Sequence, residues 1–589
     1  MSAFNEDKIE SNYNGNALLR LLSYLKPYTL SMILCLILVL ALTGFDLYRP
    51  MLVGDAIDAI EGGQSYDAIL DFALRYGIVL VLGFLFNITQ TWLLQKTGQR
   101  IIFAVRKDLY AHIQSLSCRF FDLTPVGKLV TRVTNDVEAL DEMYSGILVR
   151  LFRNIIMILG LAGVMLALDT RLALLSFVLL PAVVGITALF RVISRAAYRV
   201  TKSRLTDINT FLSENLSGMR IIQIFGREAR KYEEFNQKST ALYKAFFKEI
   251  IVFAVFRPLI YIFSILSLMI VLGVGSRDVL GDVISIGTLY IFSNYIKQFF
   301  EPIQELAEQF STLQSSLASA EKIFSILDED ALVLEKENPT ILPNILGRIE
   351  FDHVWFAYDN ENYVLRDVSF VIEPGQSVAF VGATGAGKSS ILNLIGRYYD
   401  IQKGRITIDG VDIRDLSKKQ LRSAIGQMQQ DVFLFEGTIE SNIRLYNEDI
   451  TSEEIREAAA YVNANRFIEK LEHGYDEPVT ERGATFSAGE KQLLSFARTL
   501  AHKPSILVMD EATANIDTET ELLIREALEK LMRGRTTIMV AHRLSTIQHA
   551  DCIMVMHKGK IRERGTHQEL LALNGIYKKL YDLQIRKDA

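Results

Sequence analysis

Six long stretches without Asp, Glu, Lys or Arg dominate the hydrophobic pattern of the first half of the chain. They are Pro27–Phe45, Tyr76–Gln95, Asn154–Leu168, Leu172–Phe190, Pro258–Ser276 and Val283–Ile296. A membrane-spanning helix needs about 20 mostly apolar residues, and four of the six stretches are close to that length. Asn154–Leu168 and Val283–Ile296 are shorter and need flanking residues to complete a span. The pattern predicts six transmembrane helices within residues 27–315, after a cytoplasmic segment of residues 1–26.

The connections between these stretches alternate between short and long. Lys and Arg are sparse in the short connections and gather in the long ones, Lys96–Arg153 and Arg191–Arg257. Since positively charged loops stay in the cytoplasm, both long connections and both termini are predicted to be cytoplasmic. Apolar residues recur at helical spacing in 99–118 and 196–250, which predicts membrane helices that continue into the cytoplasm.

Composition agrees with a membrane protein and excludes several other classes. Hydrophobic residues make up 50% of the 589 residues and charged residues 22%, so the chain is too apolar for disorder. A net charge of −6 gives no reason to expect a nucleic-acid partner. The three cysteines, Cys35, Cys118 and Cys552, lie far apart without metal-ligand spacing and are interpreted as structural.

The pattern changes to alternating strands from about Gly347. An apolar strand, Ser377–Val381, leads directly into a glycine loop and then into a helical pattern, which is the context that a P-loop requires. Backbone N–H groups of such a loop converge on phosphate oxygens at a helix N-terminus. The residues expected to hold the nucleotide here are Gly382, Ala383, Thr384, Gly385, Ala386, Gly387, Lys388, Ser389 and Ser390.

A second apolar run, Ser505–Met509, ends in the acidic pair Asp510–Glu511. A buried strand that ends in two carboxylates beside a P-loop predicts phosphoryl-transfer chemistry. Lys388 is expected to neutralise the β and γ phosphates, and Ser389 and Asp510 to hold Mg²⁺. Glu511 is expected to polarise the attacking water. ATP and Mg²⁺ are therefore the predicted ligands.

Taken together, these motifs resemble those of the ATP-binding cassette (ABC) exporters, in particular half-transporters. Phe120–Gly127 with Arg132–Asp136 is similar to the family's first intracellular connection, and Glu214–Arg220 is similar to the second. In the family, these connections carry short coupling helices. The implied fold is an α-helical membrane domain of six helices, a linker at 316–346, and an α/β P-loop NTPase domain of ABC type at 347–585.

The resemblance also implies roles for further residues of the ATP site. Tyr358 matches the aromatic residue that stacks on adenine. Gln430 matches the Q-loop residue that senses Mg²⁺, and Asp517 matches the D-loop that communicates between two ATP sites. His542 matches the switch histidine that contacts the γ-phosphate. Glu511, His542 and Gln430 are thus the expected catalytic residues, and Ser389, Gln430 and Asp510 the expected metal ligands.

The family signature departs from its usual Leu-Ser-Gly-Gly-Gln. Here it is Phe486–Glu490, in which Ser487 and Gly489 retain the expected contacts to the γ-phosphate of an opposite domain. Ala488 adds a Cβ and Glu490 a negative charge near that phosphate, so both changes are expected to weaken the site. An intact P-loop beside a weak signature resembles one half of a heterodimeric exporter, with a second half-transporter chain as partner. A homodimer with two mediocre sites is the alternative.

The cargo is not specified by the sequence. Polar residues that fall in or near the spans either line a wet cavity or hold helices together; they are Asn87, Gln90, Arg150, Arg153, Arg257, Asn294, Lys297 and Glu301. The resemblance implies export of a hydrophobic or amphipathic drug or lipid across the bilayer, from a multi-pass position in a bacterial inner membrane. A homodimeric exporter or lipid flippase and an ATP-gated regulator without transport are the alternatives.

Overall fold

A computed structural model describes residues 15–330, 333–359, 362–429, 432–480, 483–510, 518–540 and 547–588 of the chain. Contacts between residues divide it into two compact units. The helical unit comprises Met1–Ser115 and Pro125–Glu329, and the α/β unit comprises Leu116–Thr124 and Asp330–Ala589. The short segment Leu116–Thr124 therefore belongs by its contacts to the second unit, although it lies in sequence within the first.

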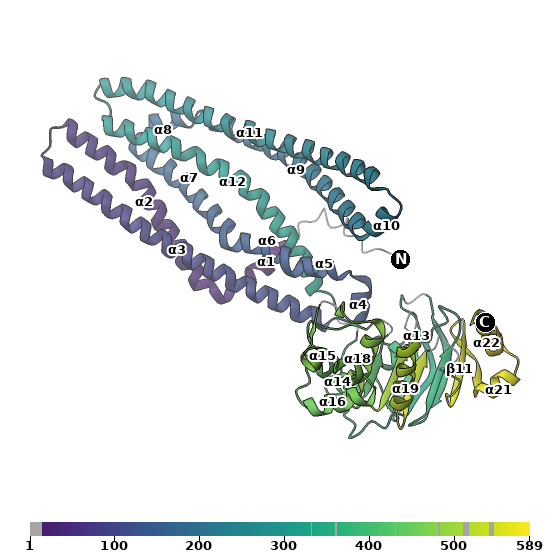
Figure 1. Ribbon diagram of the computed structural model, residues 1–589. Helices are drawn as coiled ribbons and strands as arrows, with labels where there is room; N and C mark the ends of the chain where they lie inside the picture. Colours follow the sequence, from purple (N-terminus) through teal and green to yellow (C-terminus); the bar gives the residue numbers. More distant parts are fainter. Residues whose placement is uncertain are drawn as a thin grey trace. The chain divides into compact units, whose positions relative to one another are not determined.

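The helical unit is built of very long helices that run beside one another (Figure 1). Shorter helices precede the first long helix, lie at turns between the long helices, and form the stretch that leads into α7. The elements are α1 (Gly15–Ser23), η2 (Lys26–Tyr28), α2 (Thr29–Glu61), α3 (Tyr66–Ser115), α5 (Val126–Thr131), η3 (Arg132–Asp136), α6 (Val137–Glu142), η4 (Met143–Ile147), α7 (Leu148–Leu168), α8 (Thr170–Ser176), α9 (Leu180–Ser217), α10 (Met219–Ile224), α11 (Glu228–Leu280) and α12 (Ile286–Leu327).

Five helical segments of the described chain are long and apolar enough to cross a membrane. They are Lys26–Glu61, Tyr66–Ser115, Val126–Leu168, Thr170–Ser217 and Glu228–Leu280. These segments contain the first five predicted stretches and extend well beyond them. The sixth predicted stretch, Val283–Ile296, forms the start of α12, which is not among the five because Lys297, Gln298 and Glu301 interrupt its apolar run. The number of six spans is therefore not reproduced by length and composition alone.

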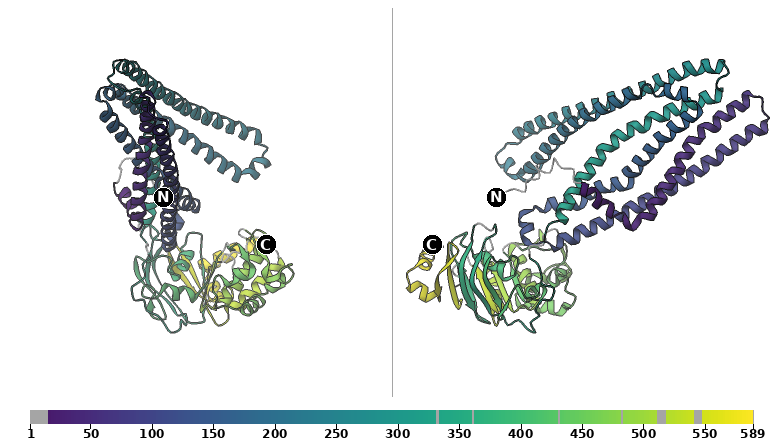
Figure 2. Two further views of the ribbon diagram at one scale, coloured as in Figure 1. Left: turned by 90° about the vertical axis from the view of Figure 1, so that its left-hand side faces the viewer. Right: turned by 180° about the vertical axis from the view of Figure 1, so that it is seen from behind.

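Helices α9 and α11 pack along each other as a long pair, and the short helix α10 lies at the turn between them (Figure 2). Helix α12 packs against α2, α7 and α11. A core of apolar side chains, among them Phe256, Tyr295 and Phe299, fills the space between α7, α8, α9, α11 and α12. The aromatic residues of these spans therefore serve mainly in packing between helices.

Helices α2 and α12 approach closely at Gly54 and Gly287. A Cβ on Gly287 would lie 2.2 Å from the carbonyl oxygen of Gly54 and 2.5 Å from Oδ2 of Asp58. Asp58 accepts hydrogen bonds from the hydroxyl of Ser285 and from the backbone N–H of Gly287, both at 2.6 Å. The carboxylate thus lies at the positive end of the α12 dipole, where a negative charge is stabilising.

The α/β unit contains three sheets. The four-stranded antiparallel sheet has the order β2-β1-β4-β5, the six-stranded sheet has the order β12-β11-β3-β10-β9-β6, and β7 pairs with β8. The strands are β1 (Ile349–Phe356), β2 (Leu365–Ile372), β3 (Ser377–Val381), β4 (Lys403–Ile408), β5 (Val411–Asp412), β6 (Ile425–Met428), β7 (Gly437–Thr438), β8 (Pro478–Val479), β9 (Ile506–Asp510), β10 (Thr536–Val540), β11 (Cys552–His557) and β12 (Lys560–Gly565). Strands β3, β9 and β10 are parallel and almost fully buried, as expected for continuous apolar runs.

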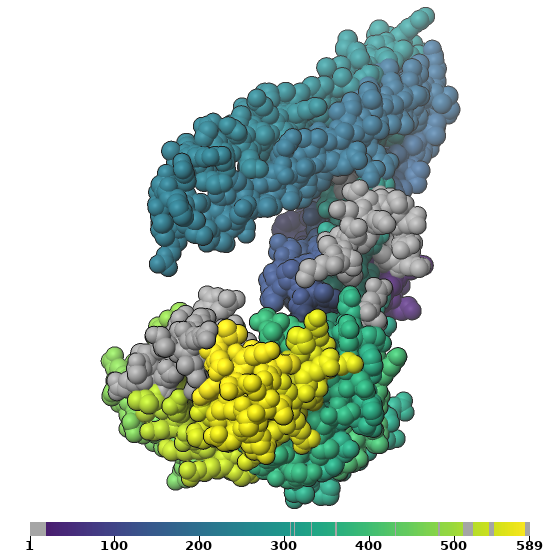
Figure 3. Space-filling view, turned by 90° about the vertical axis from the view of Figure 1, so that its right-hand side faces the viewer, coloured from purple at the N-terminus to yellow at the C-terminus, as the bar shows by residue number. Residues whose placement is uncertain are grey.

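Helices cover these sheets, and the C-terminal segment, yellow in Figure 3, lies at the surface of the unit. The helices are α4 (Cys118–Leu123), α13 (Lys388–Ile395), α14 (Lys418–Ser423), α15 (Ile439–Arg444), α16 (Ser452–Tyr461), α17 (Asn465–Ile468), η5 (Gly474–Asp476), α18 (Ala488–Ala501), α19 (Thr518–Met532), α21 (His567–Ala572) and α22 (Ile576–Asp588). Two apolar clusters, one on each side of the six-stranded sheet, form the core of this unit.

The close approach of α2 and α12 leaves no room for a side chain at position 287. We expect Gly287→Ala to lower the free energy of unfolding by about 1–3 kcal/mol, because the new methyl group must displace backbone of α2. Gly163→Ala on α7 is the matched control, since a Cβ there meets nothing within 4 Å. Thermal unfolding of the purified protein in detergent measures both variants, and equal melting temperatures would contradict the proposed packing constraint.

Candidate ATP site

The P-loop follows strand β3 and ends at the first residue of α13, which is the arrangement expected from the sequence. Gly387 adopts φ 102° at the N-cap of α13, a left-handed conformation that favours glycine. Gly382 has φ 153°, and a Cβ there would lie 2.3 Å from the carbonyl oxygen of Met556. These two glycines therefore let the loop turn tightly against β11 and present its backbone N–H groups at a helix N-terminus, where phosphate binds well.

Lys388 is held within this loop. Its side chain is buried, and Nζ donates hydrogen bonds to the carbonyl oxygens of Gly382 at 2.9 Å and Ala383 at 3.2 Å. Burial lowers the pKa of the Lys388 amine, while the charge of Asp510 acts in the opposite direction. A phosphate would stabilise the charged amine through shorter, charge-assisted bonds. The geometry therefore supports the predicted role of Lys388 as a phosphate contact.

Asp510 ends strand β9 at the same edge of the sheet. Strand β10 lies between β3 and β9, and its residue Val540 is paired with Phe380 on one side and with Asp510 on the other. Because the three strands are parallel, Asp510 and the P-loop meet at the carboxyl ends of the strands. The exposed hydroxyl of Ser389 and the carboxylate of Asp510 are the oxygen donors that Mg²⁺ prefers, so the donor set fits this ion.

Tyr358 is held in place by α13 and by a neighbouring loop. Its hydroxyl lies 3.0 Å from Oγ of Ser390 and accepts a longer bond of 3.4 Å from Nδ2 of Asn393. Gln402 fixes the preceding residue, Ala357, through two hydrogen bonds of 2.8 Å to its backbone N–H and carbonyl groups. The ring of Tyr358 is partly exposed and is thus available for stacking on a base.

The segment between α3 and α5 also reaches this region of the α/β unit. The hydroxyl of Tyr399 donates a hydrogen bond to the carboxylate of Asp122 on α4. The ring of Tyr399 packs edge-on against that of Tyr358, with 5.0 Å between the ring centroids. Cys118, at the start of α4, packs against the apolar core of the unit. A continuous contact therefore runs from the first intracellular connection to the aromatic residue expected to bind adenine.

The signature segment begins helix α18. Ser487 is the N-cap, and its Oγ accepts a hydrogen bond from the backbone N–H of Glu490 at 3.2 Å. In return, Oε2 of Glu490 accepts from the backbone N–H of Ser487 at 2.8 Å, which completes a capping box. A glutamine can accept the same bond. Glu490 thus preserves the helix start of the usual signature and differs from it by one negative charge.

The structure brings together most of the residues predicted from the sequence, but not all of them can be located. Tyr358, the P-loop residues, Ser390 and Asp510 lie on adjoining elements around β3 and β9, and Ser390 faces Tyr358. Four predicted residues lie outside the described residues: Gln430, Glu511, Asp517 and His542. Tyr399 and its contact with Asp122 were missed, because the two residues are 277 positions apart in the sequence and no spacing pattern links them.

Comparison with known proteins agrees with this architecture. Residues 32–303 match the family model of the ABC transporter transmembrane region, and residues 365–514 match the family model described as ABC transporter. The chain is 41% identical to exp8 of Streptococcus pneumoniae serotype 4, by name an ABC transporter ATP-binding protein. The alignment spans 566 residues, which is 96% of this chain and 97% of exp8. The chain belongs to the ABC transporter family. Within that family, it is a half-transporter of the exporter type.

Two further similarities extend over nearly the whole exporter. The ATP-dependent lipid A-core flippase of Syntrophus aciditrophicus is 34% identical over 581 residues, which is 99% of this chain and 96% of the flippase. The solved structure of a bacterial Atm1-family ABC exporter with ATP bound matches with a TM-score of 0.79 at 28% identity, covering 95% of this chain and 98% of that one. This exporter therefore binds ATP, is an ATPase coupled to transport, and works as part of a dimer in the membrane.

The environment of Tyr358 predicts how its variants bind nucleotide. We expect Tyr358→Ala to weaken ATP binding about fivefold or more, because stacking of an aromatic ring on a base is worth about 1–3 kcal/mol. Tyr358→Phe keeps the ring and loses only the hydroxyl contact with Ser390, so its affinity should stay within about threefold of the wild type. Titration with a fluorescent ATP analogue measures both variants; equal losses for Ala and Phe would contradict a stacking role.

Proposed function

We propose that this exporter uses ATP binding and hydrolysis to move a hydrophobic or amphipathic compound, a drug or a lipid, across the cell membrane. The observation that carries the proposal is the meeting of Lys388 and Asp510 at one edge of a parallel sheet, in a chain that also contains five apolar membrane-length helices. The lipid A-core flippase named above, with which the chain shares nearly its full length, favours an amphipathic cargo.

Each residue of the ATP site has a distinct task in this proposal. The P-loop backbone and Lys388 hold the phosphates, Tyr358 stacks on adenine, and Ser389, Gln430 and Asp510 would hold Mg²⁺. When bound, that ion would supply further positive charge to the phosphate oxygens. Glu511 polarises the attacking water and His542 contacts the γ-phosphate. Positioning and charge stabilisation of this kind are the main requirements of phosphoryl transfer.

A second chain is needed to complete the ATP site, since the signature segment of one domain caps the nucleotide of the other. The turn between α9 and α11 offers a further place for a partner to bind. Helix α10 and the residue that follows it expose a cluster of large apolar side chains, Ile221, Ile224 and Phe225. Such a cluster on a surface favours a protein contact. D-loop residue Asp517 would then communicate between the two sites of the dimer.

The partner is proposed to be a different half-transporter. Ala488 and Glu490 distinguish the signature of this chain from the usual sequence, whereas its P-loop and Asp510–Glu511 retain the hydrolytic residues. The capping box preserves the start of α18 although Glu490 replaces the usual Gln. The negative charge of Glu490 then disfavours binding of a phosphate, which is also an anion, beside it. One active and one degenerate ATP site would result.

The proposed orientation places both termini, the α/β unit and the long polar extensions of the helices in the cytoplasm. The basic residues of these extensions support this orientation by the positive-inside rule. Helix α12 is proposed as the sixth membrane span. Its packing against α2, α7 and α11 supports this assignment, although polar residues interrupt its apolar run.

The test is ATPase activity of the purified chain in lipid vesicles, alone and together with a half-transporter encoded beside it. We expect hydrolysis to need the partner and Glu511→Gln to abolish it, since Glu511 is the proposed hydrolytic base. Full activity of the single chain would contradict the heterodimer and support a homodimer. The absence of any Glu511-dependent hydrolysis under either condition would contradict the exporter mechanism and favour a regulator without transport.

The signature is tested in the same assay with Glu490→Gln. Gln keeps the capping box, so the free energy of unfolding should change by less than about 0.5 kcal/mol. Removing the charge should increase hydrolysis at the site that Glu490 faces, by up to about fivefold for a charge effect of up to about 1 kcal/mol. Glu454→Gln is the matched control, because Glu454 caps α16 in the same way, away from the signature. Equal ATPase rates for both variants would show that Glu490 does not weaken the site.

A further inference from the structure

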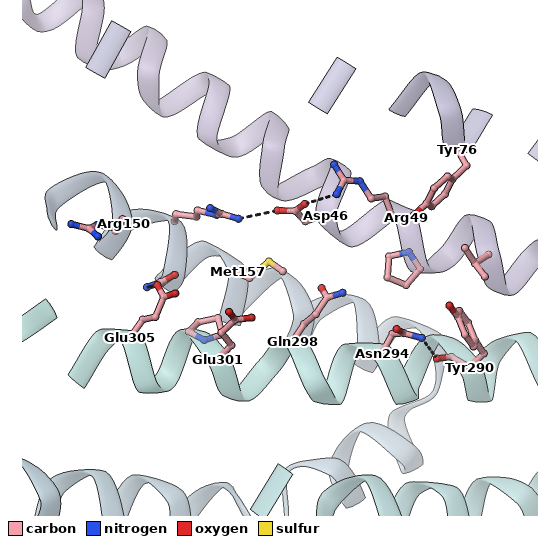
Figure 4. A pocket seen from close by; sticks show the side chains of 15 residues that line it. Asp46, Arg49, Tyr76, Arg150, Met157, Tyr290, Asn294, Gln298, Glu301 and Glu305 are labelled. Atoms are coloured by element: carbon pink, nitrogen blue, oxygen red, sulfur yellow. Dashed lines mark hydrogen bonds and ion pairs between the residues drawn. The ribbon is translucent and has the colours of Figure 1, made fainter. Parts of the chain in front are cut away.

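A cavity of about 560 Å³ lies among α2, α3, α7 and α12 of the helical unit (Figure 4). Its walls are more highly charged than expected for a cavity surrounded by membrane-length helices. Three arginines and three carboxylates line it: Arg49, Arg150, Arg153, Asp46, Glu301 and Glu305. Charged side chains at membrane depth are costly and usually mark the path of a substrate.

The positive charges lie on α2 and α7. Asp46 is the acidic partner on this side, with Oδ1 3.4 Å from a guanidinium nitrogen of Arg49 and Oδ2 3.2 Å from one of Arg153. Arg150 lines the same cavity and forms no ion pair with any of the described residues. Arg49 and Arg153 therefore share one carboxylate while Arg150 has none, and this wall carries an excess of positive charge.

The negative charges lie on α12, which Figure 4 shows across the cavity from Asp46 and Arg49. Among the described residues, Glu305 accepts hydrogen bonds only from neutral amides, at 2.9 Å from Nδ2 of Asn154 and at 3.3 Å from Nε2 of Gln309. Glu301 has no cationic partner in the described part of the chain. The α12 wall therefore carries an excess of negative charge, whereas the excess of positive charge lies on α2 and α7.

Two buried polar atoms in the lining lack hydrogen-bond partners among the described residues. They are Nε of Arg49, a donor on the positive wall, and Oε1 of Gln298, an acceptor on the negative wall. Buried polar groups are usually paired, so an unpaired donor and an unpaired acceptor point to a ligand or ordered water in the cavity. The unpaired donor lies on the positively charged wall and the unpaired acceptor on the negatively charged wall, so both would complement a ligand of the opposite charge at that wall.

We propose that this cavity binds the head group of a zwitterionic amphiphile, with its phosphate at Arg150 and Arg153 and its ammonium group at Glu301. Guanidinium groups bind phosphate oxygens in bidentate fashion, whereas a carboxylate suits an ammonium group. A purely anionic head group would leave the α12 carboxylates uncompensated, and a cation would leave the arginines uncompensated. The proposal rests on the proposed export function and narrows its cargo class.

The test measures binding in detergent without ATP, so that it does not depend on transport. Native mass spectrometry of the purified transporter compares three lipids with equal acyl chains: a phosphoethanolamine, a phosphoglycerol and a dialkyldimethylammonium. We expect the phosphoethanolamine to bind about tenfold more tightly than either other lipid, since one well-placed charge pair is worth about one order of magnitude in affinity.

Two variants test separately the contribution of each wall of the cavity to lipid binding. Arg150→Gln should lose about tenfold in affinity for the two phosphate lipids and none for the dialkyldimethylammonium. Glu301→Gln should remove the preference for phosphoethanolamine over phosphoglycerol. Lys297→Gln is the matched control, because Lys297 is exposed on the same helix and does not line the cavity. It should bind all three lipids as the wild type does.

Equal binding of the three lipids, or the same losses in Lys297→Gln, would overturn the proposal. In that case, ATP-dependent transport of another compound would leave the export function intact. Head-group selectivity that follows Arg150 and Glu301 would support the cavity proposal even if no ATP-dependent transport were found, and would then contradict only the export function. The failure of one proposal can therefore be distinguished from the failure of the other.

Discussion

The hydrogen bond from Tyr399 to Asp122 lies within the α/β unit and holds there α4, the segment of the chain that connects α3 to α5. Asp122 lies on α4, between α3 and α5 of the helical unit, yet its contacts place it in the α/β unit. The ring of Tyr399 also packs against Tyr358, the residue proposed to stack on adenine. Because α4 lies in the chain between α3 and the membrane-length segment Val126–Leu168, we infer that a change in the nucleotide site reaches the ends of both through this contact.

The helical unit shows a second constraint, which arises from charge. Helix α12 is less apolar than the five helices that meet the length and composition of a membrane span, because it carries Gln298, Glu301 and Glu305. The same residues face a cavity whose other wall is rich in arginine. The polar residues that make α12 a less apolar membrane segment thus supply one wall of the charged cavity. Packing of α12 against α2, α7 and α11 stabilises these polar residues better than contact with lipid would.

Much of this could be predicted from the sequence, because the relevant signals are local. The P-loop, the strand that ends at Asp510 and the start of α18 each depend on neighbouring residues, and the structure forms all three. The cavity was only partly predicted. Arg150, Arg153, Asn294 and Glu301 do line it, whereas Asn87, Gln90, Arg257 and Lys297 do not; Arg257 instead pairs with Glu308. Asp46, Arg49 and Glu305 were missed, because only the packing of α2 against α7 and α12 brings them together.

The central claim is that the nucleotide site drives the membrane helices through α4. Its most direct test is the number of cargo molecules transported per ATP hydrolysed in reconstituted vesicles, for wild type and Tyr399→Phe. The variant keeps the ring against Tyr358 and loses one hydrogen bond to a charged group, worth about 1.5–3 kcal/mol, so we predict a ratio lower by about tenfold or more with unchanged ATP affinity. An unchanged ratio would contradict the claim and show that energy reaches the helices by another route.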